Sequence, residues 1–316
     1  MRAIITRLKS DGTREKVLVD DWQDPGAPAE NEVRTRTLYS GITNGTERND
    51  LLGGNYAHEV DKLPAVGGYQ NVGEVIEVGS DVQELKFGDL LYMSQRHLEF
   101  CLEPEDRLHI KLPTEIKPEE AALFGVAGVA MRCCRNANLR IGNRMLVVGA
   151  GIVGQLVAQI AASVGACVTL CDVNSRRLEI AEAIGVVDEI IDVDGDGWDK
   201  HIPDCRFDVV LDAAGVLGME DKLISAAKRH GTVMFIAGRF RVEFTFNLGQ
   251  RREITIKQNS HFDNSDLYHM CRFVSKSMIQ IGPLVQDVLP VAEANRIYDT
   301  LKDEPYKLLG TVFDWR

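Results

Sequence analysis

The sequence predicts an α/β protein in which a doubly wound parallel sheet is joined to a second, β-rich domain. At roughly 150 residues per domain, a chain of 316 residues suggests two domains. Short β-type runs fill the first ~115 residues, whereas strands alternate with helices from about residue 144 to residue 260. This change of pattern within one chain indicates two domains of different architecture.

The β-rich part is marked by short runs of Val, Ile, Leu and Tyr, separated by turns that contain Gly, Asn, Asp or Pro. The runs are RAIITRL, EVRTRTLYSGI, VGEVIEVG, DLLYMS and LHIKL. Such a pattern is typical of a compact, partly barrel-like all-β unit. Pro118 then opens a helix that runs to about Asn138, with Glu119 and Glu120 near its positive dipole end. We expect this helix to join the two domains.

From Arg144 onward, buried strands and amphipathic helices alternate. The expected strands are Met145–Val148, Val168–Cys171, Glu189–Asp192, Val209–Asp212, Val233–Ile236 and Ile254–Gln258. The expected helices are Val153–Val164, Ser175–Ile184 and Glu220–Lys228. This order indicates a parallel sheet covered on both faces. The last ~50 residues return to a helix, Asp266–Met278, and two short strands around Val288 and Leu309, which suit either domain.

Composition and charge exclude several classes of protein. Acidic residues outnumber basic ones by 47 to 36, so we expect no general attraction to nucleic-acid phosphates. The seven cysteines lack CxxC spacing, and their odd number fits a reducing cytoplasm better than a disulfide framework. Residues Met145–Cys171 are uncharged over a length that permits a membrane span, but two β-rich runs flank a helix there, which predicts a buried strand–helix–strand unit. With no signal peptide either, we expect a cytoplasmic protein without membrane contact.

The clearest functional signal is a GxGxxG pattern formed by Gly149, Gly151 and Gly154, with Ile152 and Val153 at the start of the following helix. The first glycine permits a tight turn, the second lets the backbone approach a pyrophosphate, and the third lets the helix pack closely on the sheet. The helix N-terminus presents free N–H groups and positive partial charge to phosphate. We therefore predict a dinucleotide site; a glycine-rich turn without a ligand is the alternative.

An acidic residue supports the same site. Asp172 ends the next expected strand, 18 residues beyond Gly154, about where a carboxylate binds the adenosine ribose hydroxyls. Because a carboxylate repels a 2′-phosphate, we predict NAD as the cofactor, with Val173 and Arg177 beside it. NADP stays the alternative, since Arg176 and Arg177 add positive charge just downstream.

Small residues end two later strands at the same carboxyl edge, where ligands bind in open α/β sheets. They are Ala213, Ala214, Gly215 and Gly238. We include them in the predicted cofactor site, although the needs of tight turns would also explain them.

The chain resembles the medium-chain dehydrogenase/reductase superfamily over nearly its whole length. The resemblance is carried by Gly41-Ile42, Gly45-Thr46-Glu47, Gly67-Gly68-Tyr69, Gly73-Glu74-Val75 with Gly79, Gly88-Asp89, the glycine pattern and the run from Val210 to Gly215. It implies a GroES-like catalytic domain, a Rossmann dinucleotide-binding domain, a cleft between them, and a homodimer or homotetramer. We expect residues 1–128 and 264–316 to form the catalytic domain and residues 129–263 the Rossmann domain.

The chain departs from the zinc alcohol dehydrogenases of that superfamily at the metal ligands. Those enzymes carry a cysteine after Gly-Ile, a His-Glu pair after a later glycine, and a third ligand near the bridging helix. The corresponding positions hold Thr43 and Asn44, Tyr69 and Gln70, and Phe124 to Ala127. These residues do not supply the ligands that zinc requires, and the four-cysteine loop of a structural zinc is also missing, because only Cys101 occurs between Tyr92 and Leu112. We expect neither zinc.

Two zinc-lacking groups in the superfamily offer different activities. The segment YSGITNGTER is similar to the bacteriochlorophyllide dehydrogenase-like branch, which implies alcohol oxidation. Quinone and enoyl reductases also lack zinc, but they typically bind NADPH through a looser glycine motif and basic residues. The GxGxxG pattern and Asp172 favour the first group.

Without zinc, side chains must supply hydrogen-bond donors and a general base. The positions that the resemblance assigns to the cleft hold Thr43, Asn44, Glu47, Tyr69 and Gln70, with His97 further along. Tyr69 or His97 would exchange the substrate proton, and Asn44 or Gln70 would orient the substrate oxygen. Structural roles stay open: an ion pair for Glu47, a pocket wall for Tyr69 and a hydrogen-bonded position for His97.

These observations predict an NAD-dependent, zinc-independent oxidoreductase that transfers hydride between nicotinamide and a small secondary alcohol or ketone. One alternative is an NADPH-dependent reductase of quinones or other activated double bonds. A second is a dinucleotide-binding sensor or scaffold without turnover, which the missing metal ligands motivate.

Overall fold

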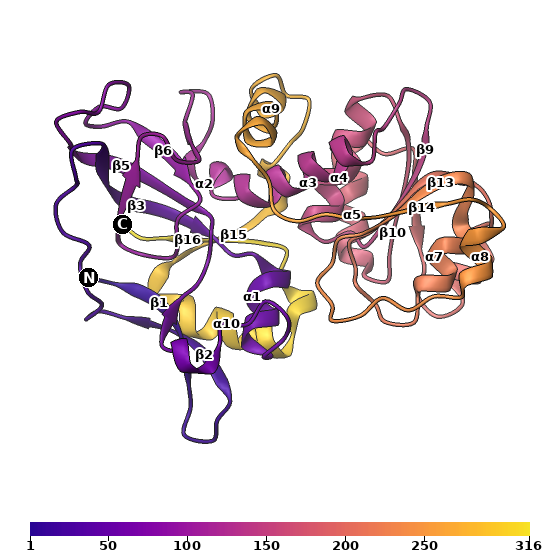
Figure 1. Cartoon of the computed structure of the whole chain (residues 1–316), viewed down its shortest axis with the longest axis horizontal. Helices are drawn as coiled ribbons and strands as arrows, with labels where there is room; N and C mark the ends of the chain where they lie inside the picture. Colours follow the sequence, from indigo (N-terminus) through magenta and orange to yellow (C-terminus); the bar gives the residue numbers. More distant parts are fainter. The chain divides into compact units, whose positions relative to one another are not determined.

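A computed structural model describes all 316 residues, and the chain divides into two compact units (Figure 1). The first unit comprises Met1–Gly125 and Val285–Arg316, and the second comprises Val126–Leu284. The chain passes from the first unit to the second inside helix α3 (Phe124–Asn136). The expected return at residue 264 lies instead at Val285.

Helix α9 (Asn264–Ser275) explains why this segment stays with the second unit. The buried carboxylate of Asp266 accepts hydrogen bonds from Arg132, at 2.9 Å, and from Arg135, both on α3. Asp263 caps α9 by accepting a hydrogen bond from the Asp266 N–H at 3.0 Å, and Asp266 accepts one from the Asp263 N–H in return. This capping box fixes the helix start, and the two arginines fix α9 to α3.

The first unit contains two sheets, as the predicted β-rich pattern requires. One is three-stranded, in the order β2-β1-β4, and the other is seven-stranded, in the order β15-β16-β3-β5-β6-β8 with β7 paired to β3. The strands are β1 (Ala3–Leu8), β2 (Arg14–Val19), β3 (Glu32–Gly41), β4 (Ala65–Val66), β5 (Asn71–Val78), β6 (Leu90–Met93), β7 (Phe100–Pro104), β8 (His109–Lys111), β15 (Val285–Pro290) and β16 (Gly310–Asp314). The helices are α1 (Asn44–Leu51), α2 (Pro118–Ala121) and α10 (Ala294–Asp303).

The end of the chain completes the first unit beside the predicted catalytic residues. Strand β16 pairs antiparallel with β3, placing Val312 opposite Gly41. The apolar face of α10, with Ile297 and Leu301, packs in one core cluster with Ile42, the residue after β3, and Phe313 of β16. The C-terminal segment therefore packs against the residues that join β3 to α1 and stabilises this loop.

The second unit is a six-stranded sheet in which every neighbouring pair is parallel. Its strands are β9 (Arg144–Val148), β10 (Cys167–Asp172), β11 (Glu189–Asp192), β12 (Phe207–Asp212), β13 (Ala227–Phe235) and β14 (Thr255–Gln258). Its further helices are α4 (Ile152–Ser163), α5 (Ser175–Ile184), α6 (Gly197–His201), α7 (Glu220–Ala226) and α8 (Phe246–Gln250). The order β11-β10-β9-β12-β13-β14 is the doubly wound Rossmann order, and its switch point lies between β9 and β12.

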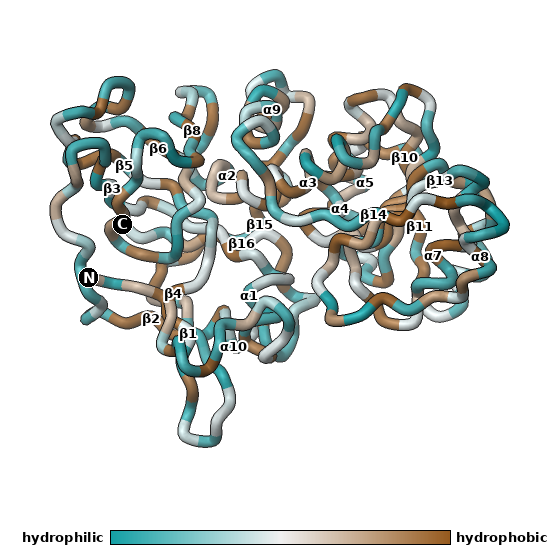
Figure 2. Tube along the Cα trace, in the orientation of Figure 1, coloured by the Kyte–Doolittle hydropathy of each residue, from teal (hydrophilic) through white to brown (hydrophobic).

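Burial follows from this topology. Strands β9, β10 and β12 are almost entirely buried, and Figure 2 shows hydrophobic chain along the central strands with hydrophilic loops around them. The uncharged stretch Met145–Cys171 forms β9, α4 and β10, which confirms the predicted strand–helix–strand unit. None of the helices combines the length and the apolar composition that crossing a membrane would need.

Candidate active site

The glycine turn between β9 and α4 has two positions at which the fold itself excludes a side chain. Gly149 has a φ of 101°, and a Cβ there would lie 2.9 Å from the Ala214 backbone nitrogen. A Cβ on Gly154 would lie 1.8 Å from the Gly149 carbonyl oxygen. The first glycine makes the turn, and the third lets α4 approach the turn, as the pattern predicts.

The middle glycine differs, because nothing inside the protein requires it. Gly151 has an ordinary φ of −66°, and a Cβ there would meet no atom within 4 Å. No side chain caps the N-terminus of α4, so its first N–H groups stay available to an anion. Open space over a glycine at an uncapped helix start fits a pyrophosphate that approaches the backbone.

Asp172 lies beside this turn at the end of β10. Its carboxylate is 9% exposed and accepts hydrogen bonds from the Ala150 N–H at 2.6 Å and the Asn174 N–H at 2.8 Å. Arg177 approaches it only to 4.0 Å. Since each oxygen has two lone pairs, the carboxylate can still accept bonds from two ribose hydroxyls. Val173, next in the chain, is 62% exposed and offers an apolar surface beside it.

The other predicted cofactor residues lie at the ends of β12 and β13. The Ala213 N–H donates to the Val148 carbonyl oxygen at 2.9 Å, which places it directly beside the glycine turn. Ala214 and Gly215 follow, and their N–H groups donate hydrogen bonds to Asp212. Gly238 lies three residues beyond the end of β13. The structure therefore brings all the predicted cofactor residues to one edge of the sheet.

In the first unit, Thr43, Gln70 and Tyr69 form a contiguous cluster. Gln70 Nε2 donates to Thr43 Oγ1 at 3.1 Å and to the Gly41 carbonyl oxygen at 3.3 Å, and Tyr69 hydrogen-bonds the Thr43 side chain. A Cβ on Gly125 would lie 2.8 Å from both the Tyr69 ring and the Gln70 side chain. The three positions that hold zinc ligands in zinc alcohol dehydrogenases thus meet here.

The chemistry of this cluster does not suit zinc. Its side-chain donors are a threonine hydroxyl, a phenol and an amide, whereas zinc sites are built from thiolate, imidazole and carboxylate groups. Across the chain, no three or more His, Cys, Asp or Glu side chains gather in a way that could hold a metal ion. The arrangement offers hydrogen-bond donors and acceptors.

Tyr69 is a buried phenol in this cluster. Burial of its hydroxyl raises its pKa to about 12; the Thr43 hydrogen bond opposes this in part, and the charge of Glu47 adds a smaller increase. The phenol therefore keeps its proton at neutral pH. It can donate a hydrogen bond to an oxygen that gains negative charge.

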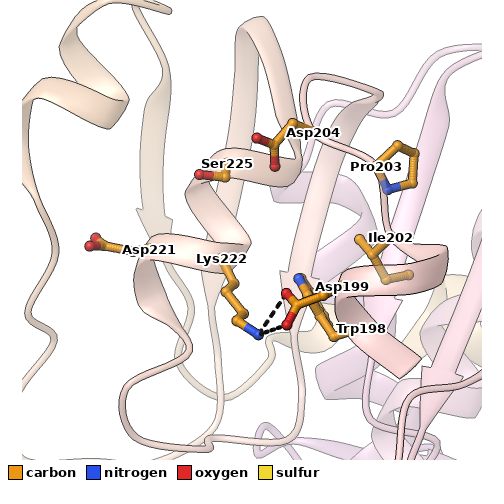
Figure 3. Close-up of a pocket in the computed structure, with 8 residues that line it drawn as sticks. All are labelled: Trp198, Asp199, Ile202, Pro203, Asp204, Asp221, Lys222 and Ser225. Carbon is orange, nitrogen blue, oxygen red and sulfur yellow. Dashed lines mark hydrogen bonds and ion pairs between the residues drawn. The ribbon is translucent and has the colours of Figure 1, made fainter. Parts of the chain in front are cut away.

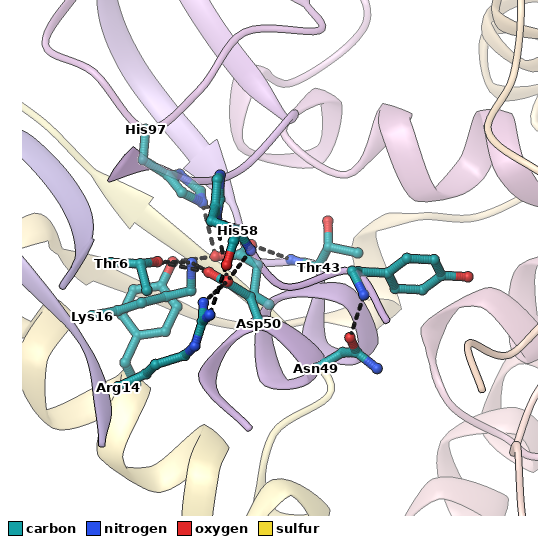
Figure 4. A network of polar contacts seen from close by, with 11 residues as sticks. Thr6, Arg14, Lys16, Thr43, Asn49, Asp50, His58 and His97 are labelled. Atoms are coloured by element: carbon teal, nitrogen blue, oxygen red, sulfur yellow. Dashed lines mark hydrogen bonds and ion pairs between the residues drawn. The ribbon is translucent and has the colours of Figure 1, made fainter. Parts of the chain in front are cut away.

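Glu47 is a buried side chain that contacts three other residues, among them Thr43 and His97, which are labelled in Figure 4. It accepts hydrogen bonds from the Thr43 N–H at 2.8 Å and the Tyr298 hydroxyl at 2.6 Å, and both its oxygens lie 3.3 Å from His97 Nε2. Burial raises the pKa of Glu47, but the charge and hydrogen bond of His97, the charge of Lys16 and the Tyr298 bond outweigh it and lower the pKa to about 2. Glu47 is thus a fixed anion that holds the chain at Thr43.

His97 is engaged on both ring nitrogens and fully buried. Its Nδ1 lies 2.8 Å from Ser40 Oγ, which also accepts a hydrogen bond from Trp315 Nε1 at 2.8 Å. These contacts fit the structural alternatives for His97 and for Glu47, whose basic partner is His97 at 3.3 Å. Both side chains are engaged in contacts within the protein.

A second buried cluster lies at the end of α1 and was not predicted. Asp50 binds Lys16 at 2.9 Å, Arg14 at 3.1 Å and the Thr6 hydroxyl at 2.7 Å, and its other neighbour His58 lies at 3.2 Å (Figure 4). Burial raises the pKa of Asp50, but Lys16 and the hydrogen bonds lower it well below its usual range. The Lys16 ammonium also lies 5.7 Å from the centre of the Tyr298 ring. Helix α1 is therefore anchored at both ends by buried charge.

Asn44 has a different environment from the one expected. Its Nδ2 donates to the carbonyl oxygens of Leu308 and Leu309, both at 3.1 Å, which ties the start of α1 to the segment before β16. Its Oδ1 is buried and has no hydrogen-bond partner in the chain. The amide nitrogen is therefore committed to the fold, and only the oxygen remains as an acceptor.

A shallow groove on the second unit holds none of the predicted site residues (Figure 3). It lies between α6 and α7 and is lined in part by Trp198, Asp199, Asp221 and Lys222. Lys222 Nζ binds Asp199 at 2.9 Å, so the one cation in the groove is already paired. The remaining acidic lining offers nothing that would hold a dinucleotide phosphate.

Comparison with known proteins connects both units to one group of enzymes. A profile of the alcohol dehydrogenase GroES-like domain matches residues 29–169, and a profile of zinc-binding dehydrogenases matches residues 153–276. Sorbitol dehydrogenase of Macaca fascicularis is 26% identical over 313 residues, with 87% of each chain covered. Probable D-xylulose reductase A of Aspergillus clavatus is 26% identical over 328 residues, with 91% of each chain covered. The crystal structure of 2R,3R-butanediol dehydrogenase from Bacillus subtilis has the same fold, with a TM-score of 0.81 at 19% identity over 100% of this chain and 99% of the other.

Proposed function

Since the chain belongs to the zinc-type medium-chain dehydrogenase/reductase superfamily and is an alcohol dehydrogenase-like oxidoreductase, we propose that it transfers hydride between NAD and a secondary alcohol or ketone without zinc. The observation that carries this proposal is the combination of an open dinucleotide turn with a catalytic cluster that lacks metal ligands. The cofactor supplies the hydride-transfer chemistry when bound, and the protein's residues bind, orient and move protons.

The residues at the end of β9 and β10 support NAD. Gly151 and the uncapped start of α4 would hold the pyrophosphate. Asp172 would accept hydrogen bonds from the two hydroxyls of the adenosine ribose. The Asp172 carboxylate opposes a 2′-phosphate, and Arg177, at 4.0 Å, stays close enough to offset only part of that repulsion. NADP is therefore the weaker ligand in this proposal.

Thr43 and Tyr69 would take the place of the metal. A developing alkoxide needs hydrogen-bond donors aimed at its oxygen, and Tyr69 is a protonated donor held by Thr43. In the direction of ketone reduction, Tyr69 would donate its proton to the oxygen as hydride arrives. Glu47 and His97 would act through Thr43 by fixing its backbone.

The substrate class follows the relatives. The curated proteins above are named as a sorbitol dehydrogenase and a D-xylulose reductase, so we include polyols and ketoses among the secondary alcohols and ketones. The alternatives of a double-bond reductase or a non-catalytic scaffold have no specific support in the site.

One experiment tests the proposal. Purified full-length protein is analysed for metals and assayed with NAD, NADH, NADP and NADPH against a panel of polyols, simple secondary alcohols, ketones, enones and quinones. We expect less than about 0.1 zinc per chain, and turnover of alcohols or ketones with NAD(H) that a chelator does not change.

Tyr69→Phe should lower kcat by roughly 100-fold with a smaller effect on KM, because it removes one donor at the reacting oxygen. Stoichiometric zinc, or activity confined to enones with NADPH, would overturn the proposal.

A further inference from the structure

A buried arginine joins three segments at the carboxyl edge of the second unit's sheet. Arg239 donates through Nη2 to Asp212 at the end of β12, and its Nη1 lies 3.3 Å from Glu220 Oε1 at the start of α7. Its Nε donates to the Ala237 carbonyl oxygen at 3.3 Å, just beyond β13. The three charged side chains are at most 5% exposed. The guanidinium makes these contacts from three nitrogens fixed in one plane, whereas an ammonium has all its donors on a single nitrogen.

The two carboxylates that Arg239 binds hold the loop between β12 and α7. Asp212 Oδ1 accepts hydrogen bonds from the Ala214 N–H at 3.0 Å and the Gly215 N–H at 2.9 Å. Glu220 Oε2 accepts one from the Gly218 N–H at 2.8 Å. Removal of the arginine would leave two buried carboxylates without a cation, and such groups move or take up protons. The conformation of the loop therefore depends on Arg239, although Arg239 is not part of the loop.

Comparison of two aspartates in this sheet shows which half of a dinucleotide depends on the loop. Asp172 ends β10 and Asp212 ends β12, on opposite sides of β9. Asp172 has no cation closer than 4.0 Å and keeps capacity for ribose hydroxyls, whereas Asp212 is taken up by Arg239 and two N–H groups. If the adenosine half lies over β10 and the pyrophosphate lies at the β9 turn, the other half extends over β12 and β13.

We propose that Arg239 is a positioning residue that presets the loop of Ala213 to Gly218 for the nicotinamide half of the cofactor. It acts through Asp212 and Glu220 and makes no contact with the cofactor itself. This inference rests on the proposed NAD-dependent function and adds to it a division of labour: Asp172 selects the adenosine half, and the Arg239 cluster orders the nicotinamide half.

The test compares a whole cofactor with its adenosine half. Calorimetry measures the Kd of full-length protein for NADH and for ADP, which lacks the nicotinamide and its ribose. For Arg239→Ala we expect the Kd for NADH to rise about tenfold or more, while the Kd for ADP stays within about twofold. Arg239→Lys should give an intermediate loss, because it keeps the charge but not the fork. Arg241→Ala is the matched control, since Arg241 lies two residues away in an exposed pair with Glu243.

Every outcome of this comparison either supports or contradicts the role proposed for Arg239. An equal loss of NADH and ADP affinity, or no loss of either, would overturn the proposal, because a merely structural residue does not distinguish the two ligands. If Arg239→Ala fails to fold, Glu220→Gln provides the second variant, with a smaller loss of NADH affinity in the same direction. Wild-type protein that binds neither ligand would contradict the proposed function, and this inference with it. If the wild type binds NADH and ADP, and the Arg239 variants bind them with unchanged Kd values, only this inference is contradicted.

Discussion

In the proposed cofactor site, Asp172 is the single residue that we expect to set the preference for NAD over NADP. In Asp172→Ala, NAD loses two charge-assisted hydrogen bonds, whereas NADP loses an electrostatic repulsion. We expect the Kd for NAD to rise by roughly 10- to 100-fold and the Kd for NADP to rise less or to fall, as measured by calorimetry. Asp192→Ala is a matched control, because Asp192 pairs with Asp172 in register on β11. A larger loss for NADP than for NAD would reverse the assignment.

Glu47 gives the first unit a specific dependence on acid. Its pKa of about 2 in the folded protein lies below the ordinary value of 4.5, so its contribution to the free energy of unfolding is fully present above pH 4.5. That contribution, on the order of 3 kcal/mol, is lost as the pH falls from about 4.5 toward 2. Glu47→Gln should lower stability at neutral pH and flatten this slope in urea titrations at several pH values. Glu59→Gln, in an exposed pair with Lys62, should leave the slope unchanged; an identical slope in Glu47→Gln would contradict the assignment.

The residues of the site differ in how far the sequence reveals them. The three glycines and Asp172 could be predicted because turn geometry and strand length fix their spacing over 24 residues. Tyr298 and Ser40 could not, because they meet Glu47 and His97 only through tertiary pairing of distant segments. The same holds for Lys16, which meets Asp50. Their polarity alone gave no signal, since buried and exposed polar residues look alike in a sequence.

At the scale of elements, the helix after the glycine turn depends on close approach to the sheet. Gly154→Ala would place a Cβ 1.8 Å from the Gly149 carbonyl oxygen, and backbone cannot yield as a flexible side chain can. We expect a loss of more than about 3 kcal/mol in the free energy of unfolding, measured by denaturant titration. Gly142→Ala tests the opposite case: its φ is +80° but its surroundings are open, so it should cost only about 1 kcal/mol. Equal losses in the two variants would show that packing of α4 does not need the glycine.

The central strands of the second unit were predicted well, whereas strand β2 of the first unit was not. Strands β9 to β12 lie within two residues of expectation, because parallel strands covered on both faces are continuous apolar runs. Strand β2 was missed because it carries Arg14, Glu15 and Lys16, of which Lys16 is buried only through its pairing with Asp50. The helix expected from Pro118 to Asn138 is divided into α2 and α3, where the Ala122 carbonyl oxygen lies against Gly41.

At the scale of the whole molecule, the α/β class was predicted correctly because each pattern repeats many times along its part of the chain. The return point at Val285 was not predicted, since it depends on the pairing of α9 with α3 through Asp266 and two arginines. A homodimer or homotetramer remains a proposal from the superfamily resemblance. Zinc independence likewise remains a proposal, which rests on the threonine and tyrosine at positions 43 and 69.

The most direct test of the central claim is a calorimetric titration of NADH into the wild-type protein and into Gly151→Ala. Because a Cβ at Gly151 meets no protein atom and its φ is ordinary, the variant should unfold at the same denaturant concentration as the wild type or slightly above it. We predict one site per chain in the wild type and at least a tenfold weaker one in the variant, since the added methyl group occupies the space of the pyrophosphate. Absence of NADH and NADPH binding to the wild type, or full affinity in Gly151→Ala, would contradict a dinucleotide site at this turn.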